Sequence, residues 1–384
     1  MGFWRLAQSS RVSSSFFKLR NYRAYGTKAT ASQQQQFPIS RERDGDYADV
    51  DWDNLGFGLV RTDYMFITRC CRDGNFEQTC LSRYGNIEIN PAAAVLNYGQ
   101  GLLEGTKAYR REDGKILLFR PDQNAIRMKI GAERMCMPSP SVEQFVDAIR
   151  QTVLANKRWV PPPGKGSFYL RPLLFGSGPM LGVAPAPEYT FLVFGSPVQN
   201  YFKEGKSLLN LYVEEEVSRA FRGGTGSVKT IANYSPVLEP MRRAKERGFS
   251  DVLYLDAENR SNIEESSASN VFLVKGNVIV TPTTSGTILE GITRKSVIEI
   301  ALDLGYEVEE RPVSVDELKK ADEVFCTGTA IGVASVGSIT YQNKRTEFRV
   351  RDDDGLVAEQ IRSALVGIQT GSIEDKKGWV LQID

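Results

Sequence analysis

The chain of 384 residues contains no histidine. This absence excludes the Ser-His-Asp triad, a cysteine nucleophile paired with histidine, and zinc sites of the HExxH type. An enzyme with this sequence that transfers protons near neutral pH must therefore use Lys, Glu, Asp, Tyr or Cys. The 5 cysteines are an odd number without repeated spacing, which is typical of a reduced compartment rather than of a disulfide framework. They contain no CxxC pair, so neither a zinc ribbon nor a thioredoxin-type centre is predicted. We expect no bound metal.

The chain also lacks long apolar stretches, and its first forty residues lack Asp and Glu. No run of eighteen apolar residues occurs, so we expect no membrane span. Residues 1–40 hold six bases, many serines and no acid, which is typical of an organellar transit peptide followed by a linker; a disordered basic tail is the alternative. The other residues hold 42 bases and 47 acids, and this mild excess of acid argues against nucleic acid as the main partner.

Hairpin patterns and helix patterns alternate along the chain, which predicts an α+β protein rather than a doubly wound parallel sheet. We divide it into a small domain at 41–195, an interdomain connection at 196–207 and a large domain at 208–384. Expected helices occupy 124–135, 141–159 and 290–305. Expected strands and hairpins occupy 115–121, 166–176, 188–196, 251–256 and 270–282. In the helix at 290–305, Thr293 is the expected N-cap and Gly305 the expected C-cap.

The segment "GGTGSVKTIANY" at 223–234 places Lys229 after a glycine-rich approach. A phosphate-binding P-loop is excluded, because that motif needs a glycine where Val228 stands. A solvated surface lysine stays open as an alternative. The neighbours of Lys229 are instead those of a buried amine, which is a competent nucleophile for a Schiff base.

Two further segments have the composition of an anion site. "GIT" at 291–293 opens a helix, whose free N–H groups bind phosphate, and "CTGTA" at 326–330 ends a strand with small and hydroxylated residues. An ordinary helix cap and an ordinary turn are the alternatives. In "NIEESSASNVF" at 262–272, one of Glu264 and Glu265 could point inward, where a carboxylate holds the proton on a pyridine nitrogen, and the other toward solvent.

From about Tyr47 to its C-terminus the chain resembles the branched-chain aminotransferases, class IV enzymes that depend on pyridoxal 5′-phosphate. The resemblance is carried by separated segments: "LNYGQGLLEGTKAYR", "NAIRMKIGAERMCMP", "YLRPLLFGSG", "GSVKTIANY", "GTILEGITRKS" and "EVFCTGTA". It implies the two-domain α+β fold of the fold-type IV enzymes, which is like that of D-amino-acid aminotransferase. It also implies a cofactor between the domains and a homodimer.

The resemblance implies a role for each matching residue. Lys229 would be the catalytic residue that forms the internal aldimine with pyridoxal 5′-phosphate and then moves the proton. The cofactor would also be bound by Arg127, Tyr234, Glu265, Ile292, Thr293 and Thr329. The substrate would be bound by Tyr98, Tyr169, Arg171, Thr329 and Ala330.

The implied activity is reversible, ping-pong transfer of the amino group of L-leucine, L-isoleucine and L-valine to 2-oxoglutarate. The products would be branched-chain 2-oxo acids and glutamate, in the synthesis or degradation of these amino acids. The implied location is the mitochondrion, with the plastid as alternative, and no membrane or nucleic-acid partner is expected. Two other hypotheses stay open: a D-amino-acid aminotransferase or aminodeoxychorismate-type lyase, and a non-catalytic cofactor-binding protein.

Overall fold

The computed structural model describes residues 47–76, 81–199, 208–348 and 356–383. The expected transit peptide at 1–40 lies outside these residues, and so does most of the expected connection at 196–207. The start of that connection is corrected, because strand β7 continues to Val198 and pairs there with Ser167. Among the described residues, no helix combines the length and apolar character that crossing a bilayer requires.

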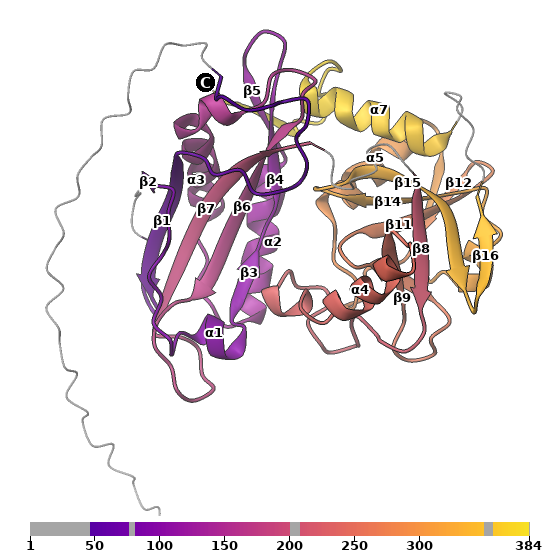
Figure 1. Cartoon of the computed structure of the whole chain (residues 1–384), viewed down its shortest axis with the longest axis horizontal. Coiled ribbons are helices and arrows are strands. Elements are labelled where there is room, and N and C mark those ends of the chain that lie inside the picture. The colour runs from indigo at the N-terminus through magenta and orange to yellow at the C-terminus, as the bar shows by residue number, and fades with distance from the viewer. Residues whose placement is uncertain (1–46, 77–80, 200–207, 349–355, 384) are drawn as a thin grey trace, which may run out of the picture. The chain divides into compact units, whose positions relative to one another are not determined.

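The first sheet is antiparallel and contains strands from both ends of the described chain (Figure 1). Its order is β17-β5-β4-β6-β7-β1-β2, and β3 pairs with β6 beside β4. The bounds are β1 Tyr64–Cys71, β2 Leu81–Arg83, β3 Gly101–Leu103, β4 Thr106–Arg110, β5 Ile116–Phe119, β6 Ser167–Gly176, β7 Glu188–Val198 and β17 Val380–Ile383.

Helices α2 (Pro121–Arg134) and α3 (Val142–Ala155) contribute to the core of the first sheet. The expected helix at 141–159 is confirmed, except that it ends earlier and a 3₁₀ turn, η1 (Lys157–Trp159), follows. Ser141 and Gln144 form a capping box at its start, so the orphan N–H groups of the first turn are satisfied. Its buried face includes Phe145, Ile149 and Val153, each of which is 0% exposed.

The start of α2 differs from the expectation. The sequence pattern predicts a strand that ends at Pro121 and a helix that begins at 124, whereas the strand ends at Phe119 and Pro121 opens the helix. Proline suits the first helical position because its missing N–H would have no partner there. The short helix α1 (Ala94–Tyr98) precedes β3 and ends at Gly99, whose φ is +63°.

The second sheet mixes parallel and antiparallel pairs in the order β10-β9-β8-β15-β14-β11-β12-β13. An additional pairing of β10 with β11 closes a ring through β9, β8, β15 and β14, and β16 pairs with β15. The bounds are β8 Leu209–Glu214, β9 Asp251–Leu255, β10 Ile263–Ser266, β11 Asn270–Lys275, β12 Val278–Thr281, β13 Glu307–Glu310, β14 Glu323–Gly328, β15 Gly332–Tyr341 and β16 Lys344–Glu347.

The expected hairpin at 270–282 is confirmed, because β11 pairs with β12 across a turn in which Gly276 has a φ of +60°. Helices α5 and α7 pack against each other, and α7 also contacts strands of both sheets. The helices of this half are η2 Ile231–Asn233, α4 Leu238–Glu246, α5 Ile292–Asp303, α6 Val315–Leu318 and α7 Val357–Thr370.

One hydrophobic core joins the end of the first sheet to the second. Phe119 of β5 and Trp379 pack edge to face at 5.7 Å, in a cluster that also contains Ile361 of α7 and Phe325 of β14. Strand β17 then pairs with β5. The last residues of the chain therefore return to the first sheet, and the proposed large domain at 208–384 does not include all of them.

Candidate active site

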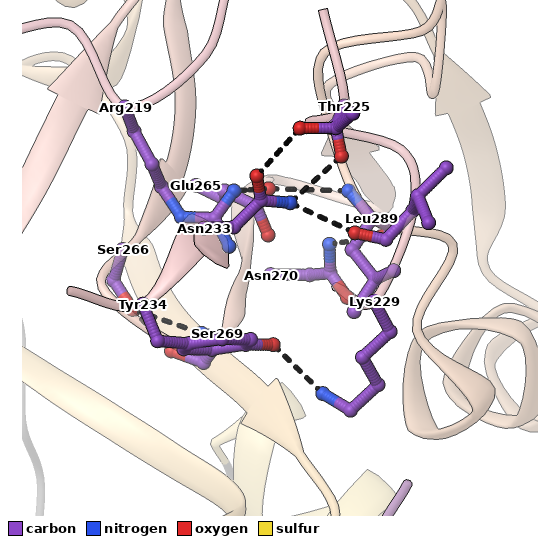
Figure 2. Close-up of polar contacts among 11 residues, drawn as sticks. Arg219, Thr225, Lys229, Asn233, Tyr234, Glu265, Ser266, Ser269, Asn270 and Leu289 are labelled. Carbon is purple, nitrogen blue, oxygen red and sulfur yellow. Dashed lines mark hydrogen bonds and ion pairs between the residues drawn. The ribbon is translucent and has the colours of Figure 1, made fainter. Parts of the chain in front are cut away.

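The loop that carries Lys229 is held in shape by Asn233. The side-chain amide of Asn233 donates to the carbonyls of Thr225 at 2.7 Å and Val228 at 2.8 Å, and its Oδ1 accepts from the Thr225 hydroxyl at 2.8 Å (Figure 2). These bonds close the turn around Lys229, so Asn233 has a structural role. Lys229 itself is half-buried rather than buried.

The same loop is fixed to the first sheet and to the segment before α5. The carbonyl of Lys229 accepts from the Leu103 amide at 3.1 Å, and the Thr230 hydroxyl donates to the Gly101 carbonyl at 2.9 Å. A Cβ added at Gly226 would lie 2.2 Å from the Thr287 carbonyl oxygen. A glycine is therefore required where the two backbones approach, and this approach sets the position of the lysine.

The amine of Lys229 has a hydroxyl partner in the next turn of chain. Its Nζ donates to the Tyr234 hydroxyl at 2.9 Å, as Figure 2 shows. Both side chains are half-buried. The structure thus brings together two of the residues that the sequence singled out, at a spacing of five positions.

Glu265 is buried in an ion pair that the sequence analysis did not foresee. Its Oε1 lies 2.5 Å from Nη1 of Arg219 and also accepts the Leu289 amide at 3.1 Å (Figure 2). The two side chains of the pair are 2% and 3% exposed. Burial raises the pKa of Glu265 above its ordinary value, while Arg219, the Leu289 amide and the charge of Lys229 act against the rise.

The expectation that one of the two glutamates points inward and the other faces solvent is wrong. The sequence predicts that Glu264 faces solvent if Glu265 points inward, but Glu264 is also buried, and burial raises its pKa. The reason is that β10 is covered on both faces along its whole length, so alternation along the strand exposes neither side chain. A tight turn from Ser266 to Ser269 then leads into Asn270, which pairs with Glu265 in the ladder.

The two expected anion-binding segments lie at one cavity. Its lining includes Ile292 and Thr293 at the start of α5 and Thr329 in the turn between β14 and β15. The expectation that Thr293 is the N-cap is wrong, because that position is held by Gly291, which supplies no side-chain cap. The first N–H groups of α5 are therefore left for another acceptor.

Arg127 projects from α2 and is held by Glu104. Its Nε and Nη2 each lie 2.7 Å from a different oxygen of the Glu104 carboxylate, and its Nη1 donates to the Glu290 carbonyl at 3.0 Å. Burial disfavours the charge, but Glu104, with smaller contributions from Tyr234 and Tyr169, holds the pKa of Arg127 above its ordinary value. One N–H on each terminal nitrogen of the guanidinium remains available.

Two of the expected substrate residues lie together on β6. The guanidinium of Arg171 sits 5.5 Å from the ring centroid of Tyr169, and the ring of Phe57 packs against that tyrosine at 5.1 Å. The Nε of Arg171 is buried and has no hydrogen-bond partner among the described residues. These side chains form a wall that is aromatic and also carries a positive charge.

The other expected substrate residues come from α1 and from the turn between β14 and β15. Tyr98 is 38% exposed, and its hydroxyl donates to the carbonyl of Leu181. The carbonyl of Ala330 accepts from Nζ of Lys107 at 3.0 Å, and burial lowers the pKa of this lysine to about 8. Among the described residues, no cluster of three or more metal-ligating side chains occurs.

Residues 101–339 match the family described as amino-transferase class IV. The chain is also 72% identical, over 379 residues, to the Arabidopsis thaliana protein named branched-chain-amino-acid aminotransferase 1, mitochondrial, and the match covers 98% of each chain. The chain belongs to the class IV aminotransferases. The resemblance found in the sequence is thereby confirmed, and the protein is a transferase that depends on pyridoxal 5′-phosphate.

Other aminotransferases support the same assignment. The Arabidopsis thaliana protein named branched-chain-amino-acid aminotransferase 2, chloroplastic, is 62% identical over 95% of this chain and 94% of its own. The crystal structure of the Escherichia coli branched-chain amino acid aminotransferase superposes with a TM-score of 0.72 at 27% identity, covering 84% of this chain and all of that one. Another branched-chain amino acid aminotransferase, solved with pyridoxamine 5′-phosphate, gives a TM-score of 0.69 at 27% identity over 84% of this chain and 99% of that one. The predicted α+β class IV fold is confirmed.

The side chains of the aminotransferase site fit pyridoxal 5′-phosphate. The uncapped start of α5 and the two remaining N–H groups of Arg127 are donors for a phosphate. The buried Glu265 carboxylate suits the ring nitrogen, and the Lys229 amine suits the aldehyde. Sequence reasoning missed the partners Arg219 and Glu104. Glu104 stands inside a segment that carried the resemblance, whereas no local pattern marks Arg219.

Proposed function

We propose that the protein catalyses reversible transamination of L-leucine, L-isoleucine and L-valine with 2-oxoglutarate, giving the branched-chain 2-oxo acids and glutamate by a ping-pong course. The observation that carries the proposal is the amine of Lys229, 2.9 Å from the Tyr234 hydroxyl and within electrostatic reach of the buried Glu265. The names of the most similar relatives support the branched-chain substrates.

In this proposal each polar group of the site has a defined task. Pyridoxal 5′-phosphate, when bound, supplies the aldehyde that carries the amino group and the ring that accepts the electrons left at Cα of the amino acid. Lys229 holds the cofactor and then moves the proton at Cα, which makes this transfer intramolecular. Tyr234 orients the lysine amine, and Glu265 keeps the ring nitrogen protonated because Arg219 and the Leu289 amide hold the carboxylate in place.

The remaining residues would bind the phosphate and the substrate. We assign the phosphate to Arg127, Ile292, Thr293 and Thr329. The uncapped α5 and the cavity that Ile292, Thr293 and Thr329 share support the last three, and the contact of Arg127 with the Glu290 carbonyl supports the first. The backbone N–H groups of the turn at 329–330 would bind the carboxylate on Cα. Both substrate classes must fit one pocket: the rings of Tyr169 and Tyr98 suit a branched side chain, and the unpaired Nε of Arg171 suits the distal carboxylate of glutamate.

The test is a kinetic panel of L- and D-amino acids with 2-oxoglutarate, using wild type, Lys229→Ala and the control Lys115→Ala, whose lysine is exposed. We expect activity with the three branched L-amino acids, its loss in Lys229→Ala with cofactor phosphate still bound, and normal activity in the control. Borohydride reduction and peptide mapping should place the pyridoxyl label on Lys229. Turnover of D-amino acids alone would favour the D-amino-acid aminotransferase, and a labelled but inactive protein would favour a non-catalytic one.

We also propose a homodimer. Several large apolar side chains are exposed on the described chain, including Leu181 at 93% and Val183 at 87% in one loop, to which the Tyr98 hydroxyl also bonds. Exposed apolar groups of this kind are typical of an interface. Light scattering coupled to size exclusion should give twice the 42.8 kDa of the chain, less any cleaved N-terminal segment; a monomer mass would refute the proposal.

We further propose a mitochondrial location, with the plastid as alternative. The basic, acid-free residues 1–40 support an organellar address, and the match to the relative named mitochondrial covers nearly the whole chain. Residues 1–40 fused to a fluorescent protein should accumulate in mitochondria of plant cells. A cytosolic signal would refute import, and a plastid signal would decide between the two organelles.

A further inference from the structure

We propose that Glu104 is a positioning residue for Arg127, and that it fixes the guanidinium beside the start of α5, where the cofactor phosphate is proposed to bind. The inference rests on the proposed phosphate role of Arg127. Glu104 lies between β3 and β4 and is 0% exposed. Its Oε1 accepts from Nε of Arg127, and its Oε2 accepts from Nη2 of Arg127 and from the Asn124 amide at 2.8 Å.

The burial of Glu104 needs a reason other than stability. A buried ion pair contributes little net stability compared with apolar residues of the same size, because both charges lose their hydration. The pair with Arg127 is nevertheless bidentate and is further fixed by Asn124 and by the Gly105 amide at 3.3 Å. Such a geometry leaves the guanidinium no freedom to rotate, which is the property that a rigid phosphate donor requires.

The direction in which Arg127 is held supports the same role. Glu104 occupies Nε and one N–H of Nη2, so that one N–H of Nη2 and the two of Nη1 point away from Glu104. The Nη1 donates to the carbonyl of Glu290, which immediately precedes Gly291 at the cap of α5. The guanidinium is thus held at the residue that precedes the N-cap of α5, whose first N–H groups have no side-chain cap.

The experiment measures the dissociation constant of pyridoxal 5′-phosphate by fluorescence titration of the full chain, in wild type, Glu104→Gln, Arg127→Gln and the double variant. Glu104→Asp is added as a conservative substitution. Glu214→Gln is the matched control, because Glu214 is also buried and also pairs with an arginine, Arg243 at 3.2 Å. Phosphorus NMR of the bound cofactor reports the environment of the phosphate independently of activity.

We expect Glu104→Gln to weaken cofactor binding about ten-fold or more, since a charge-assisted contact to the phosphate is lost or misaligned. Glu104→Asp should recover part of the affinity, and the phosphorus resonance should shift in Glu104→Gln but not in Glu214→Gln. In the Arg127→Gln background, Glu104→Gln should have no further effect. Two results overturn the inference alone. In the first, Glu104→Gln weakens cofactor binding equally in wild type and in the Arg127→Gln background. In the second, Arg127→Gln weakens binding but neither Glu104→Gln nor Glu104→Asp does. Unchanged affinity in Arg127→Gln overturns both the inference and the proposed phosphate role.

Discussion

The buried pair of Arg219 and Glu265 allows a quantitative prediction for Arg219→Met. The pair is 2.5 Å long with side chains 2% and 3% exposed, so water cannot replace the arginine when it is removed. Glu265 would keep one hydrogen bond, from the Leu289 amide. Breaking a buried pair by removing one partner costs about 3–5 kcal/mol, because a charge is left buried without compensation.

The loss should depend on pH in a defined direction. The pKa of Glu265 is already raised by burial, and removing Arg219 raises it further. For a carboxyl whose folded pKa exceeds its unfolded value, the stability that it contributes is present below the unfolded pKa, at about pH 4, and is lost as the pH rises through the folded pKa. Wild type and Arg219→Met should lose this stability in parallel until the pH reaches the folded pKa of Glu265 in wild type. Above that pH only the variant continues to lose it, so the difference in unfolding free energy should grow as the pH rises further.

The assay is urea unfolding of the cofactor-free protein at several pH values. The control is Arg243→Met, which removes the partner of the buried Glu214. The Arg243 side chain is 39% exposed, so water can replace it and the loss should be about 1 kcal/mol or less. The double variant Arg219→Met, Glu265→Met should regain most of the lost stability. A loss of about 1 kcal/mol or less in Arg219→Met, or an equal loss in the Glu265→Met background, would refute the reasoning.

Three further predictions follow from single contacts. In wild type, folded Lys107 has a pKa of about 8 and loses its proton before the unfolded state does, so wild type gains stability as the pH rises from 8 to 10.5. Lys107→Met lacks this gain, so the difference in unfolding free energy between the two proteins should change by up to about 3 kcal/mol over this range. Urea unfolding measures this difference. In Gly105→Ala the new Cβ would lie 2.0 Å from the Tyr169 hydroxyl, so the ring must move and the KM for amino acids should rise about ten-fold. In Tyr234→Phe the Lys229 amine loses its 2.9 Å partner, and stopped-flow half-reactions should slow by about ten-fold or more.

Each of these has a matched control. Lys115→Met alters an exposed lysine and should leave the stability gap independent of pH. Gly58→Ala places a Cβ where nothing lies within 4 Å, so its KM should stay at the wild-type value. Tyr64→Phe removes a tyrosine hydroxyl from strand β1 and should leave the half-reaction rate unchanged. A control that behaves like its test variant would contradict the contact on which that prediction depends.

The sequence predicted elements well where a pattern repeats over many residues and poorly where one residue sets a boundary. The buried face of α3 and the hairpin of β11 and β12 follow from apolar periodicity alone. The sequence places the N-cap of α5 at Thr293, whereas Gly291, two positions earlier, is the N-cap. It also places Pro121 at the end of a strand, whereas Pro121 opens a helix, because proline is compatible with both positions. Local propensity does not decide between such alternatives.

The amino-acid sequence is enough to assign the family, because several separated segments resemble the branched-chain aminotransferases, and the absence of histidine fits a chemistry carried by a lysine. Which charges meet inside the protein depends on the three-dimensional fold. Arg219 lies 46 positions from Glu265, and Glu104 lies 23 positions from Arg127. Periodicity in a sequence says which side chains share one face of an element, whereas the meeting of two faces depends on how sheets and helices pack. That packing also buried both Glu264 and Glu265, because the strand that carries them is covered on both sides.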